Sequence, residues 1–157
     1  LPVLIDLDHL LADEDGLLSG ILEAVDGAQR DHRGAVLYTS REERQFPSKA
    51  ERLAFGERVS AFLVRIVQNL PEAIGFLISK GGITSNDTLS KGLALRTARV
   101  LGQVRAGCSV VRCPADHPRF PDLPVVIFPG NVGGKDALAE VYHRLLARRR
   151  EEQAGIS

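Results

Sequence analysis

The sequence carries no excess of charge of either sign. Its 157 residues include 20 Lys and Arg and 20 Asp and Glu, so the formal net charge at pH 7 is zero. Non-specific nucleic-acid binding requires a basic surface, which a chain of balanced charge does not provide. The exception is local: three consecutive arginines, residues 148–150, form a short basic segment. We therefore expect no nucleic-acid partner.

Long apolar runs are also absent. No run approaches the roughly 18 residues that a membrane-spanning helix needs, and the opening residues 1–6 (LPVLID) lack the basic flank of a secretory signal. With 44% hydrophobic and 25% charged residues, the composition is that of a globular protein. We expect no membrane segment and a cytoplasmic location.

Cysteine is scarce, with two residues in the chain, Cys108 and Cys113. They lie five residues apart around an expected strand, so they should point to opposite faces, and with His117 they match no standard zinc spacing. We expect two reduced thiols. The histidines share no metal-ligand spacing either; they are His9, His32, His117 and His143. We therefore expect no metal bound by the chain's own side chains.

Methionine does not occur, and the sequence opens directly on strand-like residues. A natural start normally leaves a methionine or a short polar lead. We therefore expect residues 1–157 to be a fragment of a longer polypeptide, with processing of a complete chain as the alternative.

Short apolar runs typical of strands alternate with segments of helical periodicity. The expected strands cover residues 2–7, 35–39, 74–78, 100–104, 109–112 and 125–128. The expected helices cover residues 13–30, 48–70, 85–97 and 134–150. This alternation predicts βαβ units, and hence an α/β, three-layer Rossmann-like domain with a mostly parallel sheet.

Two local features of this pattern are of interest. Ser48 and Glu51 have the spacing of a capping box, which marks the start of the clearest helix, and Pro71 follows its end. A polar loop, residues 41–47, precedes that helix. Whether residues 100–104 and 109–112 form a hairpin or are joined by a crossover is left open by the sequence.

Two glycine loops are the most informative motifs. Residues 81–85 (GGITS) follow one expected strand, and residues 129–135 (PGNVGGK) follow another. A strand, a glycine turn and a helix in succession expose backbone N–H groups to an anion, usually a phosphate. Ligands bind at the carboxyl ends of parallel strands, where both loops should lie. The sequence therefore predicts a nucleotide or sugar-phosphate pocket.

The second loop comes close to the P-loop pattern G-x-x-x-x-G-K-[ST] but departs from it twice. Pro129 stands where the first glycine belongs, and Asp136 stands where the metal-binding hydroxyl belongs. A carboxylate there repels phosphate unless a cation lies between them, so we do not expect a true P-loop. Gly130, Gly133 and Gly134 still allow close backbone approach to an anion; the alternative is a tight turn without a ligand.

The first loop also allows two interpretations. In one, Gly81 and Gly82 expose backbone amides, Thr84 donates to a phosphate oxygen and Lys80 adds a positive charge. In the other, Thr84 and Ser85 only cap the following helix, and Lys80 is solvated.

Asp6 and Asp8 follow the first expected strand and look like the acid pair of a nucleotide pocket. No nucleophile or metal motif lies nearby, so we interpret both as structural. No catalytic triad can be assigned from the sequence.

Three segments together resemble a known family. They are residues 78–88, residues 99–103 and residues 124–137, which contain both glycine loops in order with a Leu-Gly-Gln segment between them. They resemble the four-carbon acid sugar kinase family, and within it the C-terminal nucleotide-binding domain. The likeness is strongest over residues 78–146, and the earlier part agrees only in its order of strands and helices.

The resemblance implies a single nucleotide-binding domain, residues 1–157, that forms the C-terminal part of an ATP-dependent kinase. Such a kinase phosphorylates the terminal hydroxyl of a four-carbon sugar acid, such as a 3-oxo-tetronate, threonate or erythronate, with ATP and Mg²⁺ as cofactors. The implied ATP-binding residues are Gly81, Gly82, Ile83, Thr84 and Gly130, with Asn131 and Gly133 beside them, and Lys80 and Ser85 as further candidates.

The match departs from the family in two respects. Many members have a lysine in the second loop (K-x-G-x-F-G), where residues 128–133 here read FPGNVG. The family's N-terminal domain, which holds the sugar acid and the catalytic aspartate, has no counterpart in these residues. We therefore expect that domain of the same polypeptide as partner, and weak ATP binding without kinase activity from residues 1–157 alone.

Two other functional classes fit the same loops: a non-catalytic, phosphosugar-binding regulatory module, and a scaffold with empty loops. The identity of the sugar acid, the catalytic base and the oligomeric state are left open, a homodimer being one option.

Overall fold

Pro71 marks the boundary between two compact units, Leu1–Pro71 and Glu72–Ser157, in the computed structural model of the chain. The structure describes residues 1–40 and 44–155. Three residues of the expected polar loop, 41–43, lie outside the described residues.

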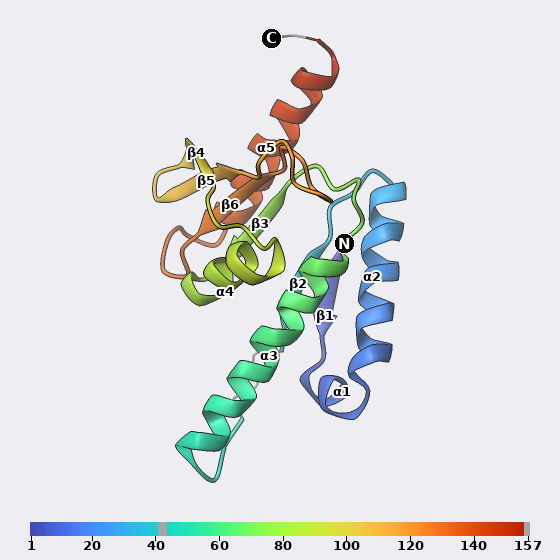
Figure 1. Cartoon of the computed structure of the whole chain (residues 1–157), viewed down its shortest axis with the longest axis vertical. Helices are drawn as coiled ribbons and strands as arrows, with labels where there is room; N and C mark the ends of the chain where they lie inside the picture. Colours follow the sequence, from blue (N-terminus) through green and yellow to red (C-terminus); the bar gives the residue numbers. More distant parts are fainter. Residues whose placement is uncertain (41–43, 156–157) are drawn as a thin grey trace. The chain divides into compact units, whose positions relative to one another are not determined.

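The first unit is built on a parallel pair of strands, β1 (Pro2–Ile5) and β2 (Val36–Thr39). The connection between them contains α1 (Leu7–Ala12) and α2 (Glu14–Arg30), and α2 packs against β1 (Figure 1). This is the predicted βαβ unit. The helix α1 was not expected from the sequence.

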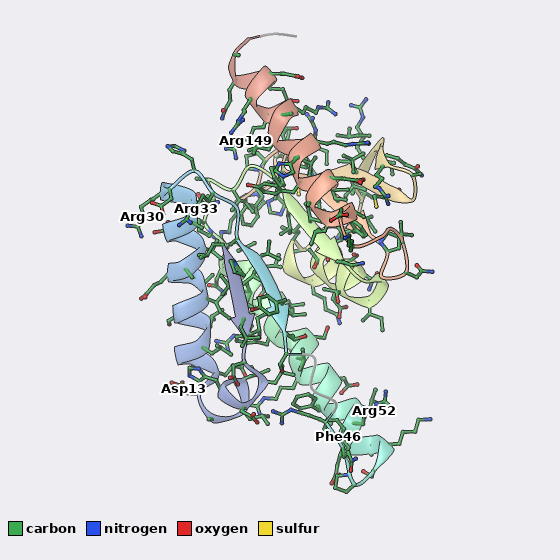
Figure 2. All side chains as sticks on the ribbon, turned by 180° about the vertical axis from the view of Figure 1, so that it is seen from behind. Asp13, Arg30, Arg33, Phe46, Arg52 and Arg149 are labelled. Carbon is green, nitrogen blue, oxygen red and sulfur yellow. The ribbon has the colours of Figure 1, made fainter. Side chains whose placement is uncertain are left out.

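Carboxylates fix the starts of both helices. The Asp6 side chain accepts hydrogen bonds from the amides of Asp8 and His9 at the start of α1. Asp13 accepts from the amide of Gly16 at the start of α2, where Figure 2 labels it. The structural interpretation of Asp6 is thus confirmed, because its carboxylate is used as a helix cap.

The helix α3 (Lys49–Asn69) completes this unit. It begins as predicted, since Ser48 Oγ accepts from the Glu51 amide at 3.2 Å. Arg65 of α3 pairs with Glu14 and, at 2.7 Å, with Asp15 of α2. The unit buries apolar side chains from β1 and all three helices, among them Ile5, Leu10, Leu18, Ile21, Val25, Phe62 and Ile66.

The second unit contains a four-stranded sheet in the order β3–β6–β5–β4. Its strands are β3 (Leu77–Lys80), β4 (Arg99–Arg105), β5 (Cys108–Arg112) and β6 (Pro124–Phe128). β3 and β6 are parallel, whereas β5 is antiparallel to both β6 and β4. The α/β class with parallel strands is confirmed, and β4–β5 is a hairpin rather than a crossover. The described part of this sheet is more mixed than expected, since two of its three pairings are antiparallel.

Helical segments cover the two faces of this sheet. α5 (Ala137–Gln153) packs on one face, in a cluster that includes Cys108, Val110, Val126, Phe128, Val141 and Leu145. On the other face, Ser79 contacts the segment formed by α4 (Gly82–Asp87) and a π-helical turn, η1 (Thr88–Gly92). Since side chains alternate along a strand, Ile78 and Ser79 point to opposite faces. A helix, a sheet and a helix are therefore layered as in a three-layer α/β fold.

Several element boundaries differ from the sequence-based expectation. β1 ends at Ile5 rather than at residue 7, and α5 covers residues 137–153 rather than 134–150. β3 begins at Leu77 rather than at residue 74, because its pairing with β6 starts at Leu77↔Val125. The next helix covers residues 82–92 rather than 85–97, because Gly81 adopts a positive φ of 112° and serves as its N-cap. No helix among the described residues is long and apolar enough to cross a membrane.

Candidate nucleotide-binding loops

The two glycine loops lie against each other. β3 and β6 are parallel neighbours with Lys80 opposite Phe128, so the loops leave the sheet at the same edge. The Gly81 amide donates to the Phe128 carbonyl at 2.8 Å. A Cβ on Gly130 would lie 3.8 Å from the Cα of Gly81. The predicted meeting of the two loops at the carboxyl ends of the strands is confirmed.

Lys80 connects the two loops further. Its ammonium group donates to the carbonyl of Gly130 at 3.1 Å and to that of Pro129 at 3.4 Å. The same nitrogen lies 4.5 Å from the centre of the Phe128 ring, within the range of a cation–π contact. These contacts hold a positive charge on an exposed side chain at the edge where the loops meet.

The first loop presents free backbone donors. Gly81, at φ 112°, caps α4 without any side-chain hydrogen bond. In the described part of the chain, no acceptor is paired with the amides of Gly82, Ile83 and Thr84. A Cβ on Gly82 would meet nothing within 4 Å, so the space in front of this turn is open.

The second loop is shaped by Gly133. Its φ is 83°, and a Cβ there would lie 2.4 Å from the Cβ of Ala137 and 2.8 Å from Nη1 of Arg105. Only glycine fits this position without a shift of neighbouring atoms. Gly130 and Gly134 have no contact this close, and Asn131 is exposed.

Two of the candidate side chains in the first loop lie in different surroundings. Ile83 is 79% exposed, so its side chain lies on the surface. Ser85 is 3% exposed, and its hydroxyl donates to the Ser79 carbonyl at 2.9 Å. The Ser85 side chain therefore points into the unit, away from the open face of the loop.

A buried polar group beneath this loop was not identified from the sequence. Ser79 Oγ and Thr88 Oγ1 lie 3.2 Å apart, and both residues are buried. Asp87, also buried, pairs with Lys91 at 2.8 Å. In the sequence, this group could have been found from Ser79, because it is a polar residue inside an otherwise apolar strand. This network fixes α4 on the sheet and thereby the position of Gly81 and Gly82.

Asp8 and His117 each make contacts with other parts of the chain. Asp8 pairs with Arg44. The ring nitrogens of His117 contact the Leu93 carbonyl at 2.8 Å and the Phe120 amide at 2.9 Å, which orders the loop between β5 and β6.

Neither cysteine is in a disulfide, and burial raises the pKa of the Cys113 thiol. Within the described ranges no cluster of three or more His, Cys, Asp or Glu could hold a metal ion.

A family model described as the nucleotide-binding C-terminal domain matches residues 1–138. The chain belongs to this family. The recognition of a C-terminal nucleotide-binding domain of the four-carbon acid sugar kinase family is thereby confirmed. No curated protein matches the chain.

Two solved structures have a similar fold. They are two crystal forms of a domain of unknown function (DUF1537) from Bordetella bronchiseptica, described as a domain-swapped dimer with bound citrate. One matches with 19% identity and a TM-score of 0.61, the other with 18% and 0.56. Each match covers 92% of this chain but 34% or 32% of the other. This chain therefore spans about a third of the length of that protein.

Proposed function

We propose that this chain supplies the ATP site of a kinase that phosphorylates the terminal hydroxyl of a four-carbon sugar acid of the 3-oxo-tetronate, threonate or erythronate type. One observation carries the proposal. Two glycine loops touch at the carboxyl ends of adjacent parallel strands, where the Gly81 amide donates a hydrogen bond to the Phe128 carbonyl. The chain that contains them belongs to the nucleotide-binding family. This edge of an α/β sheet is where nucleotides bind.

The residues present at this edge fit a polyphosphate. The amides of Gly82, Ile83 and Thr84, which have no acceptor among the described residues, form the kind of donor set that binds phosphate oxygens. The space beside Gly82 is open, and Lys80 holds a positive charge next to it. In this proposal the second wall of the pocket is formed by Gly130, Asn131 and Gly133.

ATP, when bound, would supply the phosphoryl group, with Mg²⁺ held mainly through phosphate oxygens, as is usual for this ion. Phosphoryl transfer depends on positioning and charge neutralisation more than on covalent chemistry from the protein. This chain's part is therefore to orient the phosphates with loop amides and to balance their charge with Lys80. Ser85 contributes by holding α4 on the sheet rather than by touching the nucleotide.

The sugar-acid site and the base that takes the hydroxyl proton belong, in this proposal, to an N-terminal domain of the same polypeptide. The family description as a C-terminal domain supports this arrangement, as does the coverage of about a third of the Bordetella protein. We further propose that both units belong to one nucleotide-binding domain, because the family model spans the boundary at Pro71.

The finer parts of the proposal draw on the same relatives. The citrate and the dimer described for the Bordetella protein support an acidic small-molecule ligand and a homodimer. A cytoplasmic location follows from the use of ATP.

Thermal unfolding of the 157-residue chain tests the proposal. At ten times the Kd, ATP–Mg²⁺ should raise the Tm by about 4 °C, and sugar phosphates should have little effect. Gly82→Asp places a carboxylate in open space at the loop and should abolish the ATP effect. Gly20→Asp makes the same change on the open surface of α2 and should leave it intact.

The opposite pattern identifies the competing function. Protection by a sugar phosphate and not by ATP–Mg²⁺ would indicate a regulatory phosphosugar-binding module. Turnover of a tetronate by residues 1–157 alone would contradict the assignment of the sugar-acid site to another domain.

A further inference from the structure

A pocket of about 500 Å³ opens in the Glu72–Ser157 unit. It is lined by residues 74–76 before β3, by residues 101–104 of β4, by Leu123 and Pro124 at the start of β6, and by the C-terminal half of α5. The glycine loops follow the carboxyl ends of β3 and β6, and neither loop contributes a residue to this lining. The pocket is therefore distinct from the glycine loops.

Arginine dominates the charge of this pocket. Its lining contains four arginines, Arg112, Arg144, Arg148 and Arg149, against two acidic residues, Asp122 and Glu152. Glu152 accepts from Arg148 Nε at 3.2 Å. Among the described residues, no carboxylate pairs with the other three arginines. In a chain of zero net charge, this is a local excess of positive charge.

Arg112 is the least compensated of the four. It ends β5, it is half-buried, and its Nε is buried without a hydrogen-bond partner in the described chain. Buried polar atoms in proteins are nearly always hydrogen-bonded, and burial of an unpaired charge is unfavourable. A guanidinium in this state favours an anion or ordered water beside it.

Two of the other arginines lie against the backbone. Nη1 of Arg144 donates to the Val104 carbonyl at 2.7 Å. The Arg149 guanidinium lies directly against Gly75, since a Cβ on Gly75 would be 1.7 Å from its Nη1. Arg149 projects from α5 in Figure 2. Guanidinium groups that are already positioned lose less freedom when they bind a ligand.

We propose that this pocket binds a small organic anion that carries at least two phosphate or carboxylate groups. The guanidinium fork matches both kinds of group in a bidentate manner, and two or more negative charges match the excess of arginine over acidic residues. Phe76, Val110 and Leu145 give the pocket an apolar side, which suits a ligand with a carbon skeleton.

The test is calorimetric titration of the 157-residue chain carrying Gly82→Asp, so that the glycine loops do not compete for the anion. Pyrophosphate and tricarballylate serve as phosphate and carboxylate probes. We expect saturable binding of at least one, with a Kd on the order of 0.1–1 mM, and the tighter probe identifies the acid group that is recognised. Adding Arg144→Gln and Arg149→Gln should weaken binding at least tenfold. Arg150→Gln, on the same helix but outside the pocket, should change it less than twofold.

A second variant keeps every charge. Gly75→Ala fills the space occupied by the Arg149 guanidinium and should weaken binding several-fold without altering net charge. Thermal unfolding of each variant shows whether it is folded. The proposal is overturned if neither probe binds saturably, if Arg150→Gln weakens binding as much as the double change, or if folded Gly75→Ala and double variants bind like the parent.

Discussion

The Gly81 amide donates a hydrogen bond to the Phe128 carbonyl at 2.8 Å, which links the residue after β3 to the last residue of β6. This bond continues the parallel ladder of the two strands one step beyond Lys80↔Phe128. The distance between the two glycine loops is therefore set by the sheet rather than by the loops themselves. If the loops bind phosphate as proposed, they are already positioned for it, which reduces the entropy cost of binding.

Gly133→Ala should be strongly destabilising, because the new Cβ would lie 2.4 Å from the Cβ of Ala137 at a φ of 83°. Strain and overpacking together should cost about 2–4 kcal/mol. Gly134→Ala adds the same atom in open space and should change stability by less than about 0.5 kcal/mol. Urea unfolding measures both. Equal effects of the two changes would show that the conformation at Gly133 is not required.

Lys80→Met should weaken ATP–Mg²⁺ binding about tenfold, since it removes a charge-assisted contact to phosphate. Stability should change little, because the side chain is exposed. Lys80→Arg keeps the charge and should lose less affinity. Calorimetric titration of the three proteins gives the ratios. Unchanged affinity in Lys80→Met would mean that this ammonium only braces the loops.

The contribution of Asp6 to stability should depend on pH. Hydrogen bonds from the amides of His9 and Asp8 lower the pKa of the Asp6 carboxyl group. A carboxyl whose pKa is lower in the folded state stabilises the fold above its unfolded pKa of about 3.9, and this stabilisation is lost as the pH falls through the folded value.

Asp6→Asn keeps an acceptor for the cap but removes the titration. The urea midpoint of the parent relative to this variant should therefore be constant from neutral pH to about pH 5 and should fall below about pH 4. A difference between the two proteins that stays constant down to about pH 2 would contradict the assigned shift.

Ser85→Ala should cost about 1–2 kcal/mol, because it leaves the buried Ser79 carbonyl without this donor. Ser90→Ala removes a similar bond, to the Asn86 carbonyl, at an exposed site and should cost less than about 0.5 kcal/mol. Unfolding in urea compares them. If Ser85→Ala left stability unchanged but weakened ATP binding, Ser85 would be a nucleotide contact rather than a structural residue.

Much of the fold follows from local sequence signals. The capping spacing of Ser48 and Glu51 placed the start of α3, and the apolar runs placed β1, β2 and β6. The meeting of the loops was also predictable, because parallel strands bring their carboxyl ends to one edge. These signals are local, or follow from a general rule of sheet topology.

Other features depend on contacts between distant residues. The start of β3 at Leu77 is set by its partner Val125, and the hairpin of β4 and β5 is set by strand pairing that no local pattern specifies. α4 begins at Gly82 because Gly81 takes a positive φ, although glycine rarely signals a helix start. The arginine pocket combines residues from 74 to 153, a combination that only the folded chain creates.

The most direct test of the central claim is a ¹H–¹⁵N NMR titration of residues 1–157 with ATP–Mg²⁺. We predict saturable shifts of the amides of Gly81, Gly82, Ile83 and Thr84, and of Gly130, Asn131 and Gly133. These shifts should disappear in Gly82→Asp and persist in Gly20→Asp. Saturable shifts confined to other parts of the chain, or no saturable shifts at all, would contradict the assignment of the glycine loops as the nucleotide site.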